Sequence, residues 1–521
     1  MKNKIILLIV IAFALEAPAQ ITFQKLFSGY CYSMQQTMEG GYIITGSASG
    51  FGAFEDVFLV KTNANGDSLW TKHYGGSSTD LGRSVCQTMD GGYIITGQTG
   101  SFGVGSWDVY LIKTDSLGDT LWTKTFGGTN SDVGNAVLQT ADSGYIIEGY
   151  TSSFGGYKVY LIKTDANGNA LWSRTFGGTG NNYGYNIQQT SDGGFIIVGN
   201  TYFGAGGTDV YLIKTDANGN ALWTKAIGGL FADVGYSVQQ TTDGGYIVAG
   251  VTQSFGVGST NVYLIKTDTS GNPIWSKTFG GTGYDAGQSI QQTMDGGYII
   301  TGYTFSFGAG DYDVYLIRTD TSGNLLWAKT FGGTDEDIGY SVQQITNGEY
   351  MIAGFSRSFG PNNYDFYLIK TDVNGNNGCN EGNTSTTVTT PATQVMSPAT
   401  IVSSPATIVT TPATIVGSSG TASILCATVG INEITTGNSL AISPNPFFAA
   451  TKISFSLSHS ENLSVRLIDV NGRLVSALAD KFFEEGDHEI VWSAEKENAG
   501  VYFLQFQTVE NFETMKLIVT R

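Results

Sequence analysis

The chain has 521 residues, of which 71 are Gly and only 13% are charged, so long surface helices are not expected. The length allows two or more domains with their own hydrophobic cores. The formal net charge of −18 disfavours general affinity for nucleic acid or an anionic membrane surface, because both need Lys and Arg opposite their phosphates.

Residues 1–19 have the form of a signal peptide. Lys2 and Lys4 precede the apolar run 5–15, and small residues at 17–19 supply a cleavage signal before Gln20. The apolar run is too short to span a bilayer, and no later stretch is long and apolar enough to do so. We therefore expect an exported protein without a transmembrane span.

A four-strand unit recurs along residues 20–376. The copy at 289–333 contains four short runs rich in Ile, Val, Tyr and Thr, separated by Gly- and Asn-containing turns that are typical of antiparallel strands. An aromatic residue after the first turn recurs at intervals of 50 to 52 residues, at Tyr42, Tyr93, Tyr145, Phe195, Tyr246, Tyr298 and Tyr350. Seven such units predict an all-β fold, a seven-bladed β-propeller.

The seventh copy lacks its fourth strand. The Trp of that strand appears six times, at Trp70, Trp122, Trp172, Trp223, Trp275 and Trp327. Residues 21–29 match the missing segment, with Phe23 at the Trp position, so we predict that this N-terminal strand completes the seventh sheet as its outermost strand and closes the ring. The first strand of each copy should then lie nearest the axis. The middle strands are apolar on consecutive residues, which favours packing between blades, rather than sugar stacking, as the role of the Trp and Tyr residues.

Two classes of loop should share one face of the disc. The loop between the second and third strands carries aromatic residues, and we predict a ligand-binding face at Phe102, Trp107, Phe255, Phe307 and Phe359. The loop between successive copies carries Asp80, Asp132, Asp233, Asp285 and Asp337, whose carboxylates could hold Ca²⁺. In the alternative, each Asp caps its own loop, and recurrence in successive copies favours that alternative. No other cofactor is expected.

Catalysis is the less favoured interpretation of this chain. There are three His, and no G-x-S-x-G, H-E-x-x-H or Gly-Lys phosphate loop is present. The departures from the repeat pattern, Glu148, Lys158 and Asn261, form no evident constellation. Asp is plentiful enough for the paired carboxylates of a glycoside hydrolase, so a polysaccharide-acting hydrolase stays as an alternative.

Residues 377–438 form a tract rich in Thr, Pro and Ser. Thr-Pro or Ser-Pro pairs recur every seven residues, ending at Pro391, Pro398, Pro405 and Pro412. This composition favours an extended, semi-rigid spacer, and its regular Val and Ile content leaves the alternative that it lies as a strand against something. Cys379 and Cys426 bracket the tract and could form a disulfide in an exported protein; Cys31 and Cys86 are a second candidate pair.

Residues 439–521 are predicted to form a separate small β-sandwich. Its motifs resemble the type A C-terminal sorting domain of the type IX secretion system, at Pro444, Asn445, Pro446, Gly472, Trp492, Gly500, Tyr502 and Lys516. The resemblance implies that the secretion machinery is a partner, that the protein crosses the outer membrane of a Gram-negative bacterium and that the domain is removed there. The remainder would be released or anchored on surface lipopolysaccharide.

We therefore expect an exported propeller that acts as a non-catalytic binding or adhesion module. Its ligand would be a glycan or a protein. The alternatives are the secreted hydrolase and a structural surface protein with no single ligand.

Overall fold

The described residues of the computed structural model fall into two compact units, a large one within residues 21–428 and a C-terminal one from residue 429 onward. The described residues are 20–49, 54–202, 206–360, 364–396, 401–403, 408–410, 415–417, 423–430, 440–443, 450–457, 459–469, 473–494, 500–507 and 512–519. All regular elements in these ranges are β-strands, and none of the described residues forms a helix that could cross a membrane. The signal peptide expected at 1–19 lies outside them.

The first unit consists of seven open sheets of five strands each, numbered 1 to 7 here in chain order. The first strands are β2 (Tyr30–Gln36), β6 (Asp80–Gln87), β10 (Asp132–Gln139), β14 (Asn182–Gln189), β18 (Asp233–Gln240), β22 (Asp285–Gln292) and β26 (Asp337–Gln344). The second strands are β3 (Tyr42–Ser49), β7 (Tyr93–Thr99), β11 (Tyr145–Thr151), β15 (Phe195–Thr201), β19 (Tyr246–Thr252), β23 (Tyr298–Thr304) and β27 (Tyr350–Ser356).

The third and fourth strands follow the same order. The third strands are β4 (Glu55–Thr62), β8 (Asp108–Thr114), β12 (Lys158–Thr164), β16 (Asp209–Thr215), β20 (Asn261–Thr267), β24 (Asp313–Thr319) and β28 (Asp365–Thr371). The fourth strands are β5 (Ser68–Gly75), β9 (Thr120–Gly127), β13 (Ala170–Gly177), β17 (Ala221–Gly228), β21 (Pro273–Gly280), β25 (Leu325–Phe331) and, in sheet 7, β1 (Gln20–Ser28).

The N-terminal strand completes sheet 7, as predicted. β1 pairs antiparallel with β28, with Phe23 opposite Lys370 and Phe27 opposite Phe366. Phe27 and Phe366 stack with their ring centres 4.9 Å apart. The N-terminal strand β1 and the last strand of the seventh repeat, β28, therefore lie side by side in one sheet.

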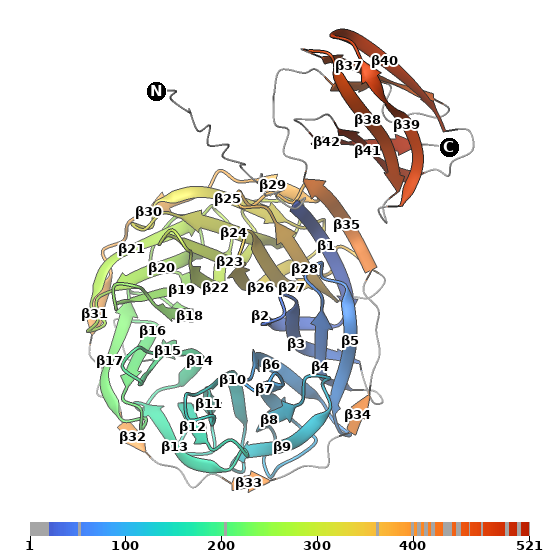
Figure 1. The fold of residues 1–521 in the computed structure, drawn as a ribbon. Coiled ribbons are helices and arrows are strands. Elements are labelled where there is room, and N and C mark those ends of the chain that lie inside the picture. Colours follow the sequence, from blue (N-terminus) through green and yellow to red (C-terminus); the bar gives the residue numbers. More distant parts are fainter. Residues whose placement is uncertain are drawn as a thin grey trace, which may run out of the picture. The chain divides into compact units, whose positions relative to one another are not determined.

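Figure 1 shows the seven sheets arranged in a ring, with the first strand of each sheet innermost. Each sheet contacts the next through its innermost strands, and sheet 7 contacts sheet 1 through β27 and β2. The second and third strands are buried on both faces, as their continuous apolar runs predict; every residue of β24, for example, is buried. Trp275 of sheet 5 packs edge-on against Tyr298 of sheet 6 at 6.0 Å, so the recurring Trp is a packing residue.

The fifth strand of every sheet comes from the Thr/Pro-rich tract. These strands are β29 (Glu381–Asn383), β30 (Thr387–Thr389), β31 (Gln394–Met396), β32 (Ile401–Ser403), β33 (Ile408–Thr410), β34 (Ile415–Gly417) and β35 (Ser423–Gly430). They add to sheets 6, 5, 4, 3, 2, 1 and 7 in that order, so the tract runs once around the rim against the order of the repeats (Figure 1). We call residues 379–426 the belt.

The belt is not the spacer that its composition favoured, because its strands pair with the outer edges of the sheets. β30 to β34 begin at intervals of seven residues, which is one interval per sheet. The middle residue of each is Val, and Val388 stands opposite Phe279 in the antiparallel register. Thr side chains add bonds to the sheet beneath, as between Thr389 Oγ1 and Thr278 Oγ1 at 2.6 Å.

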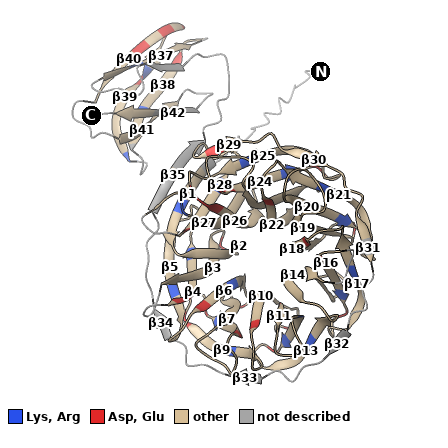
Figure 2. Cartoon of the chain, turned by 180° about the vertical axis from the view of Figure 1, so that it is seen from behind, with Lys and Arg blue, Asp and Glu red and all other residues tan. Residues whose placement is uncertain are grey.

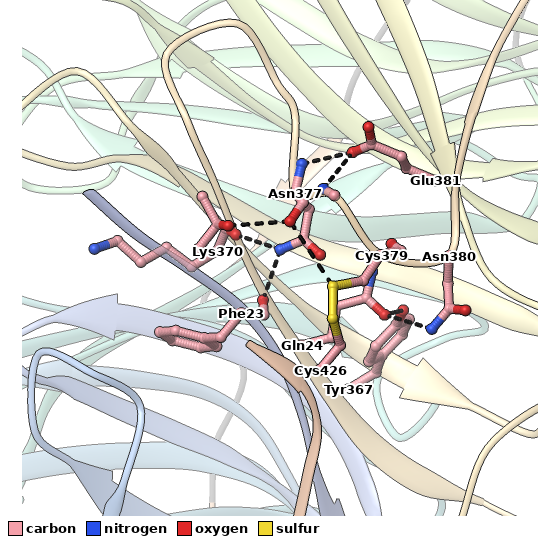
Figure 3. Close-up of a disulfide and its surroundings, with 11 residues drawn as sticks. Phe23, Gln24, Tyr367, Lys370, Asn377, Cys379, Asn380, Glu381 and Cys426 are labelled. Carbon is pink, nitrogen blue, oxygen red and sulfur yellow. Dashed lines mark hydrogen bonds between the residues drawn. A yellow bond between two sulfur atoms is a disulfide. The ribbon is translucent and has the colours of Figure 1, made fainter. Parts of the chain in front are cut away.

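The two ends of the belt meet at sheet 7, where Cys379 is joined to Cys426 by a disulfide (Figure 3). Gln24 of β1 holds this junction: its Nε2 donates to the Cys379 carbonyl at 2.5 Å, and its Oε1 accepts from Tyr367 at 2.7 Å. Asn377 Nδ2 donates to the carbonyls of Phe23 and Lys370. The other candidate pair is not joined; Cys31 and Cys86 are free thiols.

The second unit contains two sheets, in the orders β36-β37-β40 and β39-β38-β41-β42. Its strands are β36 (Leu440–Ser443), β37 (Ala450–Leu457), β38 (Glu461–Asp469), β39 (Leu474–Phe483), β40 (Gly486–Ser493), β41 (Gly500–Gln507) and β42 (Phe512–Val519). Phe455, Val465, Trp492, Leu504 and Leu517 are among the buried residues of its core. Two sheets that share one core agree with the predicted sandwich.

Candidate functional site

The recurring Asp residues of the loops between repeats are completely buried and bonded to their own loops. Asp132 accepts hydrogen bonds from the Gly128 amide at 2.8 Å, from Ser153 Oγ at 2.7 Å and from Thr151 Oγ1. A glycine amide and a serine hydroxyl donate in the same way to Asp80, Asp233, Asp285 and Asp337 in their own sheets. Each Asp therefore caps its own loop, as the alternative interpretation expected, and this structural role explains why Asp recurs in successive repeats.

Four of these carboxylates, all but that of Asp285, also face a second acid across a glycine; Asp285 faces the side-chain amide of Asn261 there. A Cβ atom on Gly332 would lie 2.0 Å from Asp313 Oδ1 and 2.6 Å from Asp337 Oδ2, so both side chains converge on the space that a glycine leaves open. Burial, with the nearby Asp337 carboxylate, raises the pKa of Asp313 to about 7. Across the described residues, no three His, Cys, Asp or Glu side chains are grouped so that they could hold a metal ion. Ca²⁺ binding at the loop Asp residues stays a prediction.

The predicted loop aromatics are largely occupied with packing. Phe102, Phe255, Phe307 and Phe359 are half-buried and lie 5.7 to 6.0 Å from Tyr110, Tyr263, Tyr315 and Tyr367 of the third strands. Trp107, also half-buried, forms an isolated parallel bridge with Ser131. Contact with a ligand through these residues stays a prediction, and Phe51 and Phe203 of the same repeat position lie outside the described residues.

A different set of residues forms the strongest candidate site. In the innermost strand of every sheet the pairing register shifts by one residue, which is a β-bulge. The seven bulge residues, called the inner ring here, are Tyr32, Arg83, Asn135, Tyr185, Tyr236, Gln288 and Tyr340. All seven are partly exposed, although they lie on the innermost strands. Bulges re-aim side chains and are common beside binding sites.

Neighbouring members of the inner ring touch one another. Tyr32 and Tyr340 lie 5.6 Å apart, and Tyr185 and Tyr236 lie 5.3 Å apart. The guanidinium of Arg83 lies 5.7 Å from the centre of the Tyr32 ring. These contacts join residues from different sheets, so the inner ring is a continuous surface along part of its circumference.

Three aromatic clusters adjoin the inner ring at the end of the strands that carries the longer loops. One contains Tyr30, Tyr364 and Phe355 where sheets 7 and 1 meet, with Arg357 stacked 5.1 Å from Tyr364. The second is Tyr150, Tyr157 and Tyr183, and the third is Tyr284, Tyr303, Phe305 and Tyr312. Phe305 is 52% exposed, and the tyrosines of all three clusters are partly exposed.

Charge is distributed unevenly between the rim and the inner ring. The fourth strands of sheets 1 to 6 carry one basic residue each at the same position, and Figure 2 shows these residues recurring around the outer strands. The inner ring contains one cation, Arg83, and no acid, in a chain with 44 acidic and 26 basic residues. The surface therefore offers aromatic faces, hydroxyl and amide groups and one guanidinium.

The departures from the repeat that the sequence singled out are structural. Glu148 of β11 is completely buried, and neither carboxylate oxygen has a hydrogen-bond partner among the described residues. Burial raises the pKa of Glu148 well above its usual range. Lys158 Nζ donates to the Gly178 carbonyl, and Asn261 Nδ2 donates to the Val257 carbonyl at 2.8 Å. None of these contacts forms an acid–base pair at the surface.

A shallow hollow of about 490 Å³ lies on the opposite end of the strands, between sheets 6 and 7. Arg318, Trp327 and Tyr350 line it. Arg318 already binds Asp295 at 2.5 Å and Tyr350 at 3.0 Å, within an ion pair that other sheets repeat with Lys, as in Lys113–Asp90 at 3.0 Å. Its polar groups are occupied, so the hollow is the weaker candidate.

The sorting-domain residues are partly described. Trp492 packs edge-on against Tyr502 at 5.7 Å, and Gly500 begins β41. Lys516 lies in β42. Pro444, Asn445, Pro446 and Gly472 lie outside the described residues.

Comparison with known proteins identifies the second unit. Residues 441–520 match the family model of the secretion system C-terminal sorting domain, which confirms the resemblance drawn from the motifs. This domain directs export through the type IX secretion system to the surface or surroundings of a Gram-negative cell. The protein therefore has an extracellular destination.

Two further similarities are to whole proteins. The regulatory protein FlaEY of Caulobacter vibrioides is 26% identical over 192 residues, which cover 30% of this chain and 20% of that relative. This chain thus matches about a fifth of the relative's length. PorZ, a bacterial surface component of the type IX secretion system of Porphyromonas gingivalis, is 12% identical with a TM-score of 0.32, over 92% of this chain and 58% of that one.

Proposed function

We propose that the seven sheets form a closed seven-bladed β-propeller that acts outside the cell as a non-catalytic binding module. Its ligand contacts the inner ring and the aromatic clusters beside it. The ring of sheets, the contact between sheets 7 and 1 and the belt around the rim support the closed propeller. The sorting domain supports a role at the cell surface or in the medium, with the propeller anchored or released after export.

The inner ring is the observation that carries this proposal. Trp, Tyr, Asp and Gly recur at the same positions in most of the sheets because packing and turns need them there. At the bulge they carry four Tyr, one Arg, one Asn and one Gln, so the fold accepts several side chains there. Partly exposed side chains that differ between otherwise similar repeats are free to serve recognition rather than folding.

The chemistry of the inner ring favours binding over hydrolysis. A glycoside hydrolase needs two carboxyl groups on either side of the scissile bond. The inner ring has none, and the unusual acid Glu148 is completely buried. Tyr, Asn, Gln and Arg offer stacking faces and hydrogen bonds, which suit a sugar chain or a polar protein surface.

A binding screen with exchanges inside the inner ring tests the proposal. The exported chain is screened against glycans and matrix proteins, together with Tyr236→Gln and Tyr340→Asn. Other sheets carry Gln288 and Asn135 at the same position, so both variants should fold with an unchanged melting temperature. We expect affinity to fall by about tenfold or more for each, because aromatic anchors dominate such sites.

The matched control is Met89→Gln, at a turn residue that is 68% exposed on the opposite end of the strands. It should leave affinity unchanged. Ring variants that fold and bind every ligand of the screen as tightly as the parent would refute the inner ring as the site.

A further inference from the structure

Arg83 is a cation without an acidic partner. Its Nε and Nη2 atoms donate to Gln98 Oε1 at 3.2 and 3.1 Å, and no carboxylate of a described residue lies within 4 Å of its nitrogens. Glu55, which like Arg83 acts on the pKa of Tyr32, accepts a hydrogen bond from Ser47 at 2.9 Å. Arg83 is only partly exposed, so part of its hydration has been lost without an ion pair in return.

This situation contrasts with the basic residues at the ends of the third strands. All seven are paired with an acid of the adjoining turn: Lys61, Lys113, Lys163, Lys214, Lys266, Arg318 and Lys370. Acids outnumber bases by 44 to 26 in this chain, so an acidic partner for Arg83 would be easy to supply. The fold does not require Arg at the bulge either, because the other sheets carry Tyr, Asn or Gln there.

The charge of Arg83 acts on two tyrosines of the inner ring, Tyr32 and Tyr340, and on Tyr150 of an adjoining aromatic cluster. Burial raises the pKa values of Tyr32, Tyr150 and Tyr340, and the guanidinium acts in the opposite direction on all three. Tyr32 lies between Arg83 and Tyr340. A ligand that reaches Arg83 therefore also meets two half-exposed aromatic rings.

We propose that Arg83 binds a carboxylate of an acidic polysaccharide, whose sugar rings stack on Tyr32 and Tyr340. This assignment rests on the proposed function. Aromatic faces bind the apolar faces of sugars, and a planar guanidinium pairs with a carboxylate through two parallel hydrogen bonds. A single cation beside neutral stacking groups suits a ligand that is held mainly through its sugar rings and pairs one carboxylate at a time, whereas binding to nucleic acid takes several cations.

The test compares one polymer in two charge states. The exported chain is titrated with polygalacturonate and with its fully methyl-esterified form, which keeps the sugar rings and removes the charge. We expect the acidic form to bind about tenfold tighter at low salt, with the preference decreasing as ionic strength rises. Arg83→Gln, which copies position 288, should bind both forms equally with an unchanged melting temperature.

Two further variants separate the two proposals. Lys124→Gln on the rim is the matched control for loss of one positive charge and should keep the preference for the acid. Tyr340→Asn should weaken both forms of the polymer alike.

An Arg83→Gln variant that keeps the preference would overturn the assignment of Arg83 and leave the inner ring as the binding site. If neither form binds, while another ligand of the screen binds and is lost in Tyr340→Asn, the polysaccharide is refuted and the proposed function stands. If no ligand responds to any inner-ring variant, the proposed function itself fails.

Discussion

Removing the disulfide between Cys379 and Cys426 should destabilise the whole ring, because the bond closes the belt around all seven sheets. The two residues are separated by 47 positions. The chain-entropy relation for a closed loop of that size gives a loss of about 14 cal/mol/K in the unfolded chain, or about 4 kcal/mol at 25 °C. We expect Cys379→Ser/Cys426→Ser to lower the free energy of unfolding by that order.

The assay is denaturant unfolding of the parent and the double variant, each with and without a reducing agent. The reduced parent should match the variant, and the variant should not respond to the reducing agent. Cys86→Ser, which removes a free thiol, is the control and should behave like the parent. A double variant less than about 1 kcal/mol weaker than the parent would refute the reasoning that the belt constrains the unfolded chain.

The place where the belt first detaches from the sheets can be measured separately from the free energy of global unfolding. The belt strands β29 to β34 have three residues each, so little pairing holds any one of them to its sheet. Without the disulfide, the belt should detach from its ends. Limited proteolysis should then cut within residues 384–420 before it cuts the repeats, whereas the oxidised parent should resist cleavage there.

Two other properties should follow from the buried acids. The pKa of Asp313, about 7 in the folded protein and near 4 in the unfolded chain, means that the folded state keeps a proton that the unfolded state releases. Stability should therefore fall as pH rises from about 4 to about 7, by on the order of 3 kcal/mol, and Asp313→Asn should flatten this dependence in urea unfolding at pH 5 and pH 8. An equal pH dependence in parent and variant would contradict it. Gly332→Ala should lower the free energy of unfolding by about 1–3 kcal/mol, because the new Cβ would overlap the carboxylates of Asp313 and Asp337. Gly100→Ala is the control and should lower it less, because no neighbour lies closer than 3.1 Å to that Cβ. Equal melting temperatures for the two variants would count against the overlap.

The repeats could be predicted from sequence because each needs the same residues. Turn glycines, the recurring Trp and the continuous apolar strands are local requirements, and they identified the unit, its seven copies and the missing strand at Phe23. The belt could not be predicted in the same way. A strand of three residues shows no alternation of polar and apolar residues, and its partner lies more than a hundred residues away in sheet 5, where Val388 stands opposite Phe279.

The residues of the candidate site also divide into those that recurrence brings to attention and those that it does not. Recurrence drew attention to Phe102 and Asp132, and the structure uses these residues for packing and loop capping. The inner ring carried the opposite signal, since position 83 and its equivalents differ between repeats. What the sequence does not show is the bulge, which gives these side chains a different direction from the alternating residues around them.

The seven-residue interval of the belt ties the length of the belt to the circumference of the ring of sheets. At about 3.3 Å per residue, one interval can reach at most roughly 23 Å from one outer edge towards the next. Adding a repeat of about fifty residues would lengthen the circumference, and the belt would then end one sheet short of Cys379. The number of sheets can therefore change only if the number of seven-residue intervals in the belt changes with it. We expect the disulfide between Cys379 and Cys426 to form only when the number of belt intervals matches the number of sheets.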